Sequence, residues 1–355
     1  MLNQGSPANH SGSSLARTMR AVVLHEFSKP FVIEQVDRPE TEPDEVLIET
    51  RTCGICCTDI HMQDGVAYVP ELPYIPGHEP AGVVVEVGCD VNDVFVGDRV
   101  VPYLFITDGD ELHKDPRHAP SATVKHIIGT SIPGGFAEYF KAPARNLLKL
   151  PPNIPFESGG LVSCAIITAV HALHRSRAAA GETAIVIGIG GIGIVEIQIL
   201  AAKGCRVIAI GRTPEDLDLA RHAGADMAVT AEQSAKIMSF TGGNGADLAF
   251  DLVGIASTMK TCVDLLRVRG RLIIIGEEDE CPPINTIQIA QRELEILGSR
   301  NGGIDDAREA IELMTRGVVT PRIDRVMPLE QFNEAMDYMR SGKARGRVVI
   351  RVKDD

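Results

Sequence analysis

A short segment, residues 53–61 (CGICCTDIH), gathers thiols, a hydroxyl, a carboxylate and an imidazole. About twenty residues later, the triplet Gly77-His78-Glu79 places a second imidazole beside a carboxylate. Catalytic zinc sites use three protein ligands, often Cys and His together, and leave a fourth position open. Cys56 and His78 can supply two such ligands, and the third must come from elsewhere. Cys164, which precedes a glycine-rich region, is the best candidate.

Cys53 and Cys56 also form a CxxC pair, a pattern found in redox couples and in structural zinc knuckles. The chain has no second CxxC, which argues against a knuckle. Cys53 follows an apolar stretch and is interpreted as a small buried residue. The remaining cysteines have no metal-like neighbours and are assigned to packing: Cys89, Cys205, Cys262 and Cys281.

A glycine-rich turn, residues 188–193 (GIGGIG), follows a short apolar run and opens a helical stretch. In that setting, GxGxxG is typical of dinucleotide binding. Gly188 permits the tight turn, Gly190 allows a pyrophosphate to approach the backbone, and Gly193 lets the helix pack closely on the strand. Gly191 belongs to the same cofactor-binding turn. The alternative is a strand-to-helix turn without a ligand.

The choice of nicotinamide cofactor depends on the residues after the next predicted strand, Arg206–Ile210. An acidic residue about 20 positions after the first glycine would hold an NAD ribose. Here that position reads Gly211-Arg212-Thr213, and the nearest acids, residues 215–216, are expected to start the next helix. Because a guanidinium forms paired hydrogen bonds with phosphate, the sequence favours NADP(H) over NAD(H). The alternative is a solvated Arg212 beside an NAD site that lacks the acid.

The elements that position these residues divide the chain. Residues 19–165 contain short strands separated by turns, which predicts a β-rich domain. Residues 166–304 alternate apolar strands with helices, which is typical of an α/β, doubly wound parallel sheet. Residues 305–355 could belong to either domain and are assigned to the first. Residues 1–18 are polar, rich in Ser and Gly, and are expected to form a flexible tail.

The composition limits the possible partners. The chain has 355 residues with 48 acidic and 35 basic side chains, a formal net charge of -13. Such a charge would repel nucleic acid and anionic lipid. The longest uncharged apolar stretch, residues 184–195, is shorter than the roughly 20 residues of a membrane-spanning helix. The 8 cysteines are too sparse for a disulfide scaffold, which favours a reducing cytoplasm.

Taken together, these motifs resemble the zinc-dependent alcohol dehydrogenases of the medium-chain dehydrogenase/reductase superfamily. The resemblance covers nearly all of the chain after the tail and rests on GICCTDIH, PGHEPAGVVVEVG, GDRVVP, GGFAEY, the Cys164 segment, GIGGIG and GKARGRVVI. It implies a GroES-like catalytic domain joined to a Rossmann domain. It also implies that Cys56, His78 and Cys164 bind a catalytic zinc, with Glu79 next to the metal.

The resemblance further implies a proton relay and additional cofactor contacts. Thr58 would take the alcohol proton and pass it through the nicotinamide ribose to His61, while Asp59 would orient the zinc-bound histidine. Thr168 would lie against the nicotinamide, and Arg347 would reach the pyrophosphate. Each residue also has a simpler interpretation: Thr58 as a helix cap, Asp59 as a first-turn charge, His61 as a surface side chain, Thr168 as a helix-facing residue and Arg347 as a solvated strand residue.

Two features depart from the family pattern. Many members carry four closely spaced cysteines after GDRVVP, around a structural zinc, whereas residues 103–133 of this chain contain no cysteine. One catalytic zinc per subunit and no structural zinc are therefore expected. His113, His118 and His126 in that segment are interpreted as solvated. Cys57 occupies a position at which family members vary.

The expected activity is hydride transfer between a nicotinamide cofactor and an alcohol, aldehyde or ketone, with zinc as a Lewis acid. One alternative is a zinc-free quinone or enoyl reductase of the same superfamily, against which the intact Cys56, His78 and Cys164 argue. Another is a catalytically silent, nucleotide-sensing protein. The resemblance implies a homodimer or homotetramer, and the expected partners are small-molecule substrates in the cytoplasm.

Overall fold

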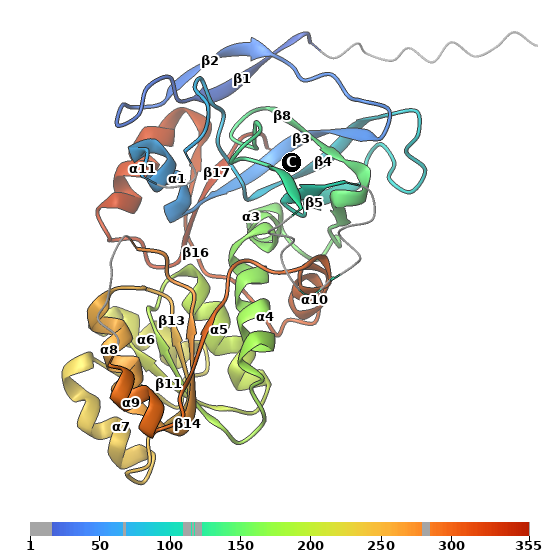
Figure 1. The fold of residues 1–355 in the computed structure, drawn as a ribbon. Coiled ribbons are helices and arrows are strands. Elements are labelled where there is room, and N and C mark those ends of the chain that lie inside the picture. Colours follow the sequence, from blue (N-terminus) through green and yellow to red (C-terminus); the bar gives the residue numbers. More distant parts are fainter. Residues whose placement is uncertain are drawn as a thin grey trace, which may run out of the picture.

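Two β-sheets organise the molecule. The computed structural model describes residues 16–66, 69–108, 115, 117, 123–278 and 285–354. Figure 1 shows a lobe around a seven-stranded sheet above a lobe around a six-stranded sheet, with the helices packed against both.

The six-stranded sheet is parallel and lies between two apolar layers. Along β10 (Thr183–Ile187), Ala184 and Val186 join one hydrophobic cluster while Ile185 and Ile187 join another, so both faces are covered. The strand order is β12 (Met227–Val229), β11 (Arg206–Ile210), β10, β13 (Ala246–Asp251), β14 (Leu266–Ile274) and β15 (Glu295–Gly298). The predicted doubly wound parallel sheet is confirmed. The strand order reverses direction between β10 and β13, the point at which such sheets bind ligands.

The second sheet joins distant parts of the chain. Its order is β16 (Ile323–Pro328), β17 (Arg347–Arg351), β3 (Glu45–Ile55), β4 (Pro80–Val87), β5 (Arg99–Pro102) and β9 (Leu147–Lys149), with β8 (Tyr139–Pro143) also paired to β3. β17 is parallel to β16 and antiparallel to β3, so it lies between them. Residues after 305 therefore supply two strands to the sheet that the first part of the chain builds.

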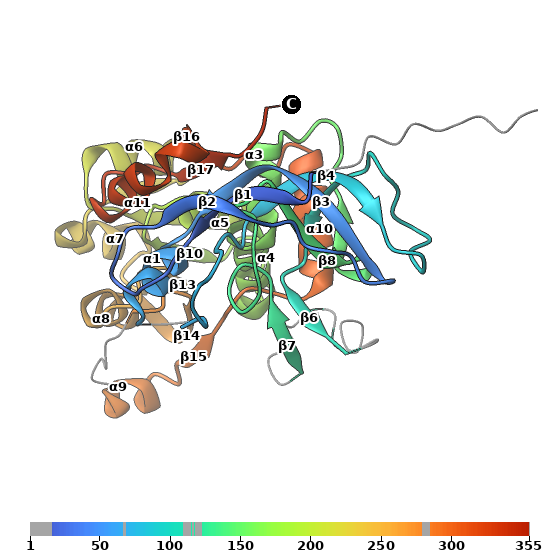
Figure 2. The same ribbon diagram turned by 90° about the horizontal axis from the view of Figure 1, so that it is seen from above.

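Two hairpins complete the strands: β1 (Thr18–Val23) with β2 (Val32–Asp37), and β6 (Phe105–Thr107) with β7 (Val124–Ile127). Figures 1 and 2 show β1 and β2 on the side of the upper lobe that faces away from the six-stranded sheet. β1 begins one residue inside the expected tail, most of which lies outside the described residues. The domain borders themselves stay a prediction.

Helix α4 (Ala165–Ser176) joins the two lobes. It packs against α5 (Gly191–Ala202) and α10 (Ile304–Thr315), and it belongs to a hydrophobic cluster that also contains residues of β4 and β5. The other α-helices are α1 (Cys57–Asp64), α3 (Phe156–Gly159), α6 (Pro214–His222), α7 (Ser234–Phe240), α8 (Ala256–Leu265), α9 (Thr286–Gln291) and α11 (Phe332–Arg340). Short 3-10 turns are η1 (Ala144–Asn146), η2 (Gly160–Ser163), η3 (Ala231–Gln233) and η4 (Leu329–Gln331).

Within the described ranges, no individual helix has both the length and the apolar character required to cross a membrane. The bent pair Phe156–Ser163 and Ala165–Ser176, with 47° between its helices, passes the same test of length and composition.

Glu196 on α5 is a carboxyl group buried without compensation. It is fully buried, and neither of its oxygens has a hydrogen-bond partner among the described residues. Burial raises the pKa of Glu196 well above its ordinary value, because a charge in an apolar interior is costly. The folded protein therefore retains a proton at this position that the unfolded chain has released.

Linkage gives a testable consequence for Glu196. The stabilising effect of the bound proton is complete below the unfolded pKa and is lost as pH rises towards the raised folded pKa, at about 1.4 kcal/mol per pH unit. A Glu196→Gln variant should match the wild type near pH 4 and unfold at a higher denaturant concentration than the wild type at pH 8. Denaturant midpoints across that range measure the difference. A wild-type to variant gap that does not widen with pH would contradict the assignment.

Candidate active site

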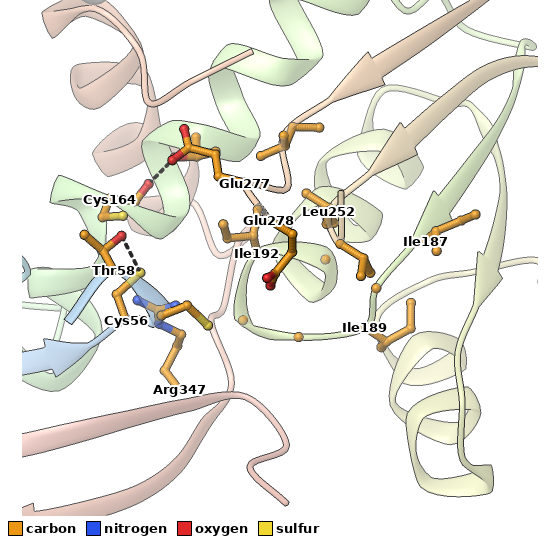
Figure 3. A pocket seen from close by; sticks show the side chains of 18 of the residues that line it. Cys56, Thr58, Cys164, Ile187, Ile189, Ile192, Leu252, Glu277, Glu278 and Arg347 are labelled. Carbon is orange, nitrogen blue, oxygen red and sulfur yellow. Dashed lines mark hydrogen bonds between the residues drawn. The ribbon is translucent and has the colours of Figure 1, made fainter. Parts of the chain in front are cut away.

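Four ligand-type side chains from three separate segments meet at one point. Cys56 lies directly after β3, His78 and Glu79 directly precede β4, and Cys164 directly precedes α4. Their ligand atoms all lie within 4.8 Å of one another, and Figure 3 shows Cys56 and Cys164 close together. β3 and β4 pair with each other, and the N–H of Gly54 donates to the carbonyl of Glu79 at 3.0 Å. This pairing brings the first two segments together.

The charges in this cluster depend on one another. Hydrogen bonding with Cys164 lowers the pKa of Cys56 well below its ordinary value, although burial opposes the shift. The same contact and burial raise the pKa of Cys164. Burial alone would lower the pKa of His78, but the charges and hydrogen bonds of Asp59 and Cys56 together outweigh it and raise that pKa. The site thus favours a thiolate at Cys56, the form of cysteine that binds metals.

Asp59 supports the cluster from α1. Its Oδ2 accepts the N–H of Cys56 at 2.8 Å, and its Oδ1 lies 3.5 Å from Nδ1 of His78. Asp59 is fully buried, and it faces the histidine in the way that the carboxylate of a ligand-orienting pair would. It also lies in the first turn of the helix, and the two interpretations of this residue are therefore compatible.

Glu79 and Arg347 form a buried ion pair across β4 and β17. Arg347 is 6% exposed and Glu79 0%. Burial raises the pKa of Glu79 against the opposing charge of Arg347, while Arg347 keeps a raised pKa because Glu79 and Cys56 outweigh its own burial. A Cβ at Gly191 would lie 2.1 Å from Cδ of Arg347, so only glycine lets the arginine lie against the turn. The simpler interpretation of Arg347 as a solvated residue is wrong.

Thr58 and His61 project from α1 into the same cleft as Cys56. Sγ of Cys56 lies 3.7 Å from Oγ1 of Thr58. Thr168, one turn into α4, also lines the cleft, and its hydroxyl donates to the carbonyl of Cys164 at 2.6 Å. The cleft thus places a hydroxyl and an imidazole beside the cluster.

The other end of the cleft is the glycine turn between β10 and α5. Gly188 has φ of +99°, a conformation suited to glycine, and a Cβ at Gly193 would lie 1.9 Å from the Gly188 carbonyl oxygen. A Cβ at Gly190 would meet no atom within 4 Å, which leaves its backbone open to a ligand. The cleft has a volume of about 530 Å³ and is lined by residues of both lobes, with Cys56 in the cluster and Gly211 near the glycine turn. Figure 3 shows the cluster residues at one side and Ile187 and Ile189 at the other.

The chain matches two protein-family models: the alcohol dehydrogenase GroES-like domain over residues 42–152 and the zinc-binding dehydrogenase domain over residues 191–316. An alcohol dehydrogenase of Geobacillus stearothermophilus is 34% identical over 341 residues, which are 95% of this chain and 100% of the relative. This chain belongs to the alcohol dehydrogenases of the medium-chain dehydrogenase/reductase superfamily. It is a nicotinamide-dependent enzyme that interconverts alcohols and carbonyl compounds.

Two further similarities cover almost the entire dehydrogenase. The crystal structure of an alcohol dehydrogenase from the archaeon Aeropyrum pernix is 32% identical, with a TM-score of 0.85 over 94% of this chain and 100% of that chain. The D-arabinose 1-dehydrogenase (NADP(+)) of Saccharolobus solfataricus is 34% identical over 343 residues, 93% of this chain and 97% of the relative. The expected GroES-like and Rossmann architecture is thereby confirmed.

The cysteines and histidines outside the dehydrogenase's cluster have mixed outcomes. Cys53 is fully buried in β3, as expected, and Cys205 and Cys262 are buried too. The assignment of Cys89 to packing is wrong, because it is exposed in the turn after β4. His126 is exposed, as expected. Three residues with predictions lie outside the described ranges: His113, His118 and Cys281.

Cys57 lies beside the cluster as an exposed thiol that lines the cleft. Partial removal of the thiol from water disfavours its charged form and, together with the negative charge of Cys56, raises the pKa of Cys57 to about 11. It therefore remains a neutral thiol at physiological pH, unlike its neighbour.

One residue at the nucleotide end of the dehydrogenase cleft, Arg345, was not predicted from the sequence. Arg212 is exposed and lines the cleft after Gly211, and Thr213 caps α6 by accepting the N–H of Asp216 at 3.2 Å. Asp216 does start the helix, as expected, but it also lines the cleft and is 7% exposed. Arg345, which precedes β17, lines the same end. Arg345 comes to lie near Arg212 only because the two lobes dock, so no local sequence signal marks it.

Further lining residues lie around the cluster. They come from the segments after β5, β7, β14 and β15 and include Leu104, Thr130, Glu277, Glu278, Arg300 and Asn301. Figure 3 shows Glu277 and Glu278 between the cluster and the glycine turn. No motif in the sequence marks these positions, because they are brought to the cleft by strand ends that differ among folds of this kind.

Proposed function

We propose that this dehydrogenase holds one catalytic zinc on Cys56, His78 and Cys164 and transfers hydride between NADP(H) and a small alcohol, aldehyde or ketone. The observation that carries the proposal is the convergence of these three side chains in the cleft that the glycine turn also lines. Glu79 lies within the same cluster, next to the proposed ligands.

The cluster has the donor chemistry of a catalytic zinc site. Thiolate and imidazole are preferred zinc ligands, and three protein ligands leave one position for a substrate oxygen. Nδ1 of His78 faces Asp59, whereas Nε2 is buried without a hydrogen-bond partner among the described residues, as is Oε2 of Glu79. Such orphaned atoms favour a bound cation. When bound, zinc would supply Lewis acidity that polarises the substrate oxygen and makes its proton more acidic.

The protein's own residues would handle that proton and the water around it. The Thr58 hydroxyl lies beside Cys56 and can accept the proton, which His61, also in the cleft, can carry to solvent. Thr168 is held by its bond to the Cys164 carbonyl and limits the space on one side of the nicotinamide position. Leu104 and Phe105 line the same region with apolar surface that excludes water.

NADP(H) is favoured over NAD(H) by the residues that follow β11. Relatives are named for either cofactor, so the proposal depends on this chain's own side chains. Gly211 is followed by the exposed guanidinium of Arg212, where an NAD enzyme would have a carboxylate for the ribose. Gly188, Gly190, Gly191 and Gly193 would hold the pyrophosphate, which Arg347 would also approach.

The proposal extends to assembly and location. β15 is an outer strand of the six-stranded sheet and pairs on one side only among the described strands, an edge that supports a homodimer or homotetramer joined through the nucleotide-binding lobes. All seven described cysteines are unpaired, which supports a reducing cytoplasm.

Metal analysis with activity assays tests the proposal. We expect one zinc per subunit by elemental analysis, and oxidation of NADPH faster than NADH with a panel of aldehydes and ketones. Removal of the metal by a chelator should abolish turnover, and added zinc should restore it. Full turnover without metal would instead indicate a zinc-free reductase. Bound cofactor with no turnover on any substrate would indicate a nucleotide sensor, and two zincs would contradict the expectation for residues 103–133.

A further inference from the structure

An ion pair connects the two lobes at the nucleotide end of the cleft. Nε of Arg345 lies 3.0 Å from Oδ1 of Asp216. Asp216 belongs to the first turn of α6, in the nucleotide-binding lobe, whereas Arg345 precedes β17, in the catalytic lobe. Both line the cleft together with Arg212. The pair thus lies where the proposed NADP(H) would place its adenosine ribose.

The Asp216 carboxylate holds the loop that would contact this ribose. Its Oδ2 accepts the N–H groups of Arg212, at 3.2 Å, and Thr213, at 3.0 Å, which completes a capping box with the Thr213 side chain. The Asp216 side chain also packs against Gly211, because a Cβ there would be 2.9 Å from Cβ of Asp216. A negative charge at this position would repel a ribose 2′-phosphate. Asp216 therefore conflicts with NADP(H) unless its charge is offset.

Arg345 is held in the position that offsets it. Its Nη1 donates to the carbonyls of Gly342, at 3.0 Å, and Ala344, at 3.2 Å, and its own carbonyl accepts Nε of Arg322 at 2.8 Å. Its side chain is 25% exposed and that of Asp216 10%, so water screens their attraction only in part. With Arg212, the cleft end has two guanidinium groups for one carboxylate.

We propose that Arg345 is a specificity-determining residue for the cofactor: it offsets Asp216 and, with Arg212, provides a second guanidinium for the 2′-phosphate. This inference rests on the proposed use of NADP(H). In the absence of Arg345, the Asp216 carboxylate in the first turn of α6 would favour an unphosphorylated ribose. Cofactor choice would thus depend on a residue that the other lobe supplies, distant in sequence from the loop that contacts the ribose but 3.0 Å from its Asp216 carboxylate.

Binding of cofactor fragments to the metal-loaded enzyme isolates the 2′-phosphate. Titration calorimetry with 2′,5′-ADP and 5′-AMP compares ligands that differ only by this group. We expect Arg345→Ala to weaken 2′,5′-ADP binding at least about tenfold and to leave 5′-AMP binding unchanged, because an arginine contact to phosphate is charge-assisted. Arg340→Ala is the matched control. Arg340 lies on the same C-terminal segment as Arg345 and forms an ion pair with Asp64, but it does not line the cleft. It should change neither affinity.

A second variant separates charge from structure. Asp216→Asn keeps an oxygen for the capping bonds and removes the negative charge, so adding it to Arg345→Ala should recover part of the lost affinity for 2′,5′-ADP. If the wild type prefers 2′,5′-ADP and Arg345→Ala changes both fragments equally or neither, Arg345 has no such role, and Arg212 alone explains NADP(H) use. If the wild type has no preference for 2′,5′-ADP, the proposed cofactor itself is wrong, and this inference with it.

Discussion

A Cys56→Ser variant should lose its metal and at least about three orders of magnitude in turnover. Serine is a poor zinc ligand at neutral pH, whereas the Cys56 thiol is held as a thiolate by Cys164. Lewis-acid assistance is worth several kcal/mol, and each 1.36 kcal/mol of barrier is a factor of ten in rate. Elemental analysis and the turnover rate at saturating cofactor measure the two losses.

Cys53 provides the matched control for this variant. It is fully buried three residues earlier on β3, outside the ligand cluster. A Cys53→Ser variant should keep its metal and nearly all of its turnover while losing some stability, because it buries a hydroxyl. Loss of metal from both variants would revive the CxxC interpretation, and a Cys56→Ser enzyme with full metal would refute the proposed ligand set.

The second large effect is expected at Arg347. An Arg347→Met variant leaves Glu79 fully buried without its counter-charge. Breaking a buried ion pair by removing one partner costs about 3–5 kcal/mol. Chemical denaturation of the metal-loaded enzyme should therefore show a free energy of unfolding lowered by about that amount. Adding Glu79→Gln should recover part of the loss, because the uncompensated charge is gone.

Arg351 lies on the same strand and is the control for Arg347. Its ion pair with Glu157, at 3.0 Å, is formed by side chains that are 45% and 26% exposed. Exposed pairs contribute roughly 0–1 kcal/mol, so Arg351→Met should have little effect. Equal losses of stability from the two variants would show that the buried Glu79–Arg347 pair contributes no more than the exposed Glu157–Arg351 pair.

Local motifs were sufficient to predict which ligand-type side chains gather in the cleft. The CGICCTDIH segment, the Gly77-His78-Glu79 triplet and Cys164 each lie next to a regular element. The pairing of β3 with β4 brings the first two together, and Cys164 joins them from the start of α4. The glycine turn could be predicted for the same reason, because Gly188 and Gly193 serve a contact within one strand and one helix. In the glycine turn the sequence spacing itself sets the geometry.

Contacts between residues far apart in the sequence could not be predicted in this way. The partner of Arg347 is Glu79, 268 positions away, and the partner of Asp216 is Arg345. No helical or strand period relates such residues. The first pair depends on the order of β17, β3 and β4 within one sheet, and the second depends on how the two lobes dock. From neighbouring residues alone, the simpler interpretation of Arg347 as solvated is wrong, whereas the expectation that Asp216 starts a helix is correct but incomplete.

The position of β17 between β16 and β3 has a consequence for biosynthesis. Every strand of the six-stranded sheet lies between residues 183 and 298, so a nascent chain can complete that sheet while still attached to the ribosome. The other sheet has to wait until residues 347–351 have left the exit tunnel, because β17 fills the place between β3 and β16. Until then the inner edge of β3 is unpaired and exposed to other chains. The enzyme thus gains its nucleotide platform first, and its catalytic lobe closes last.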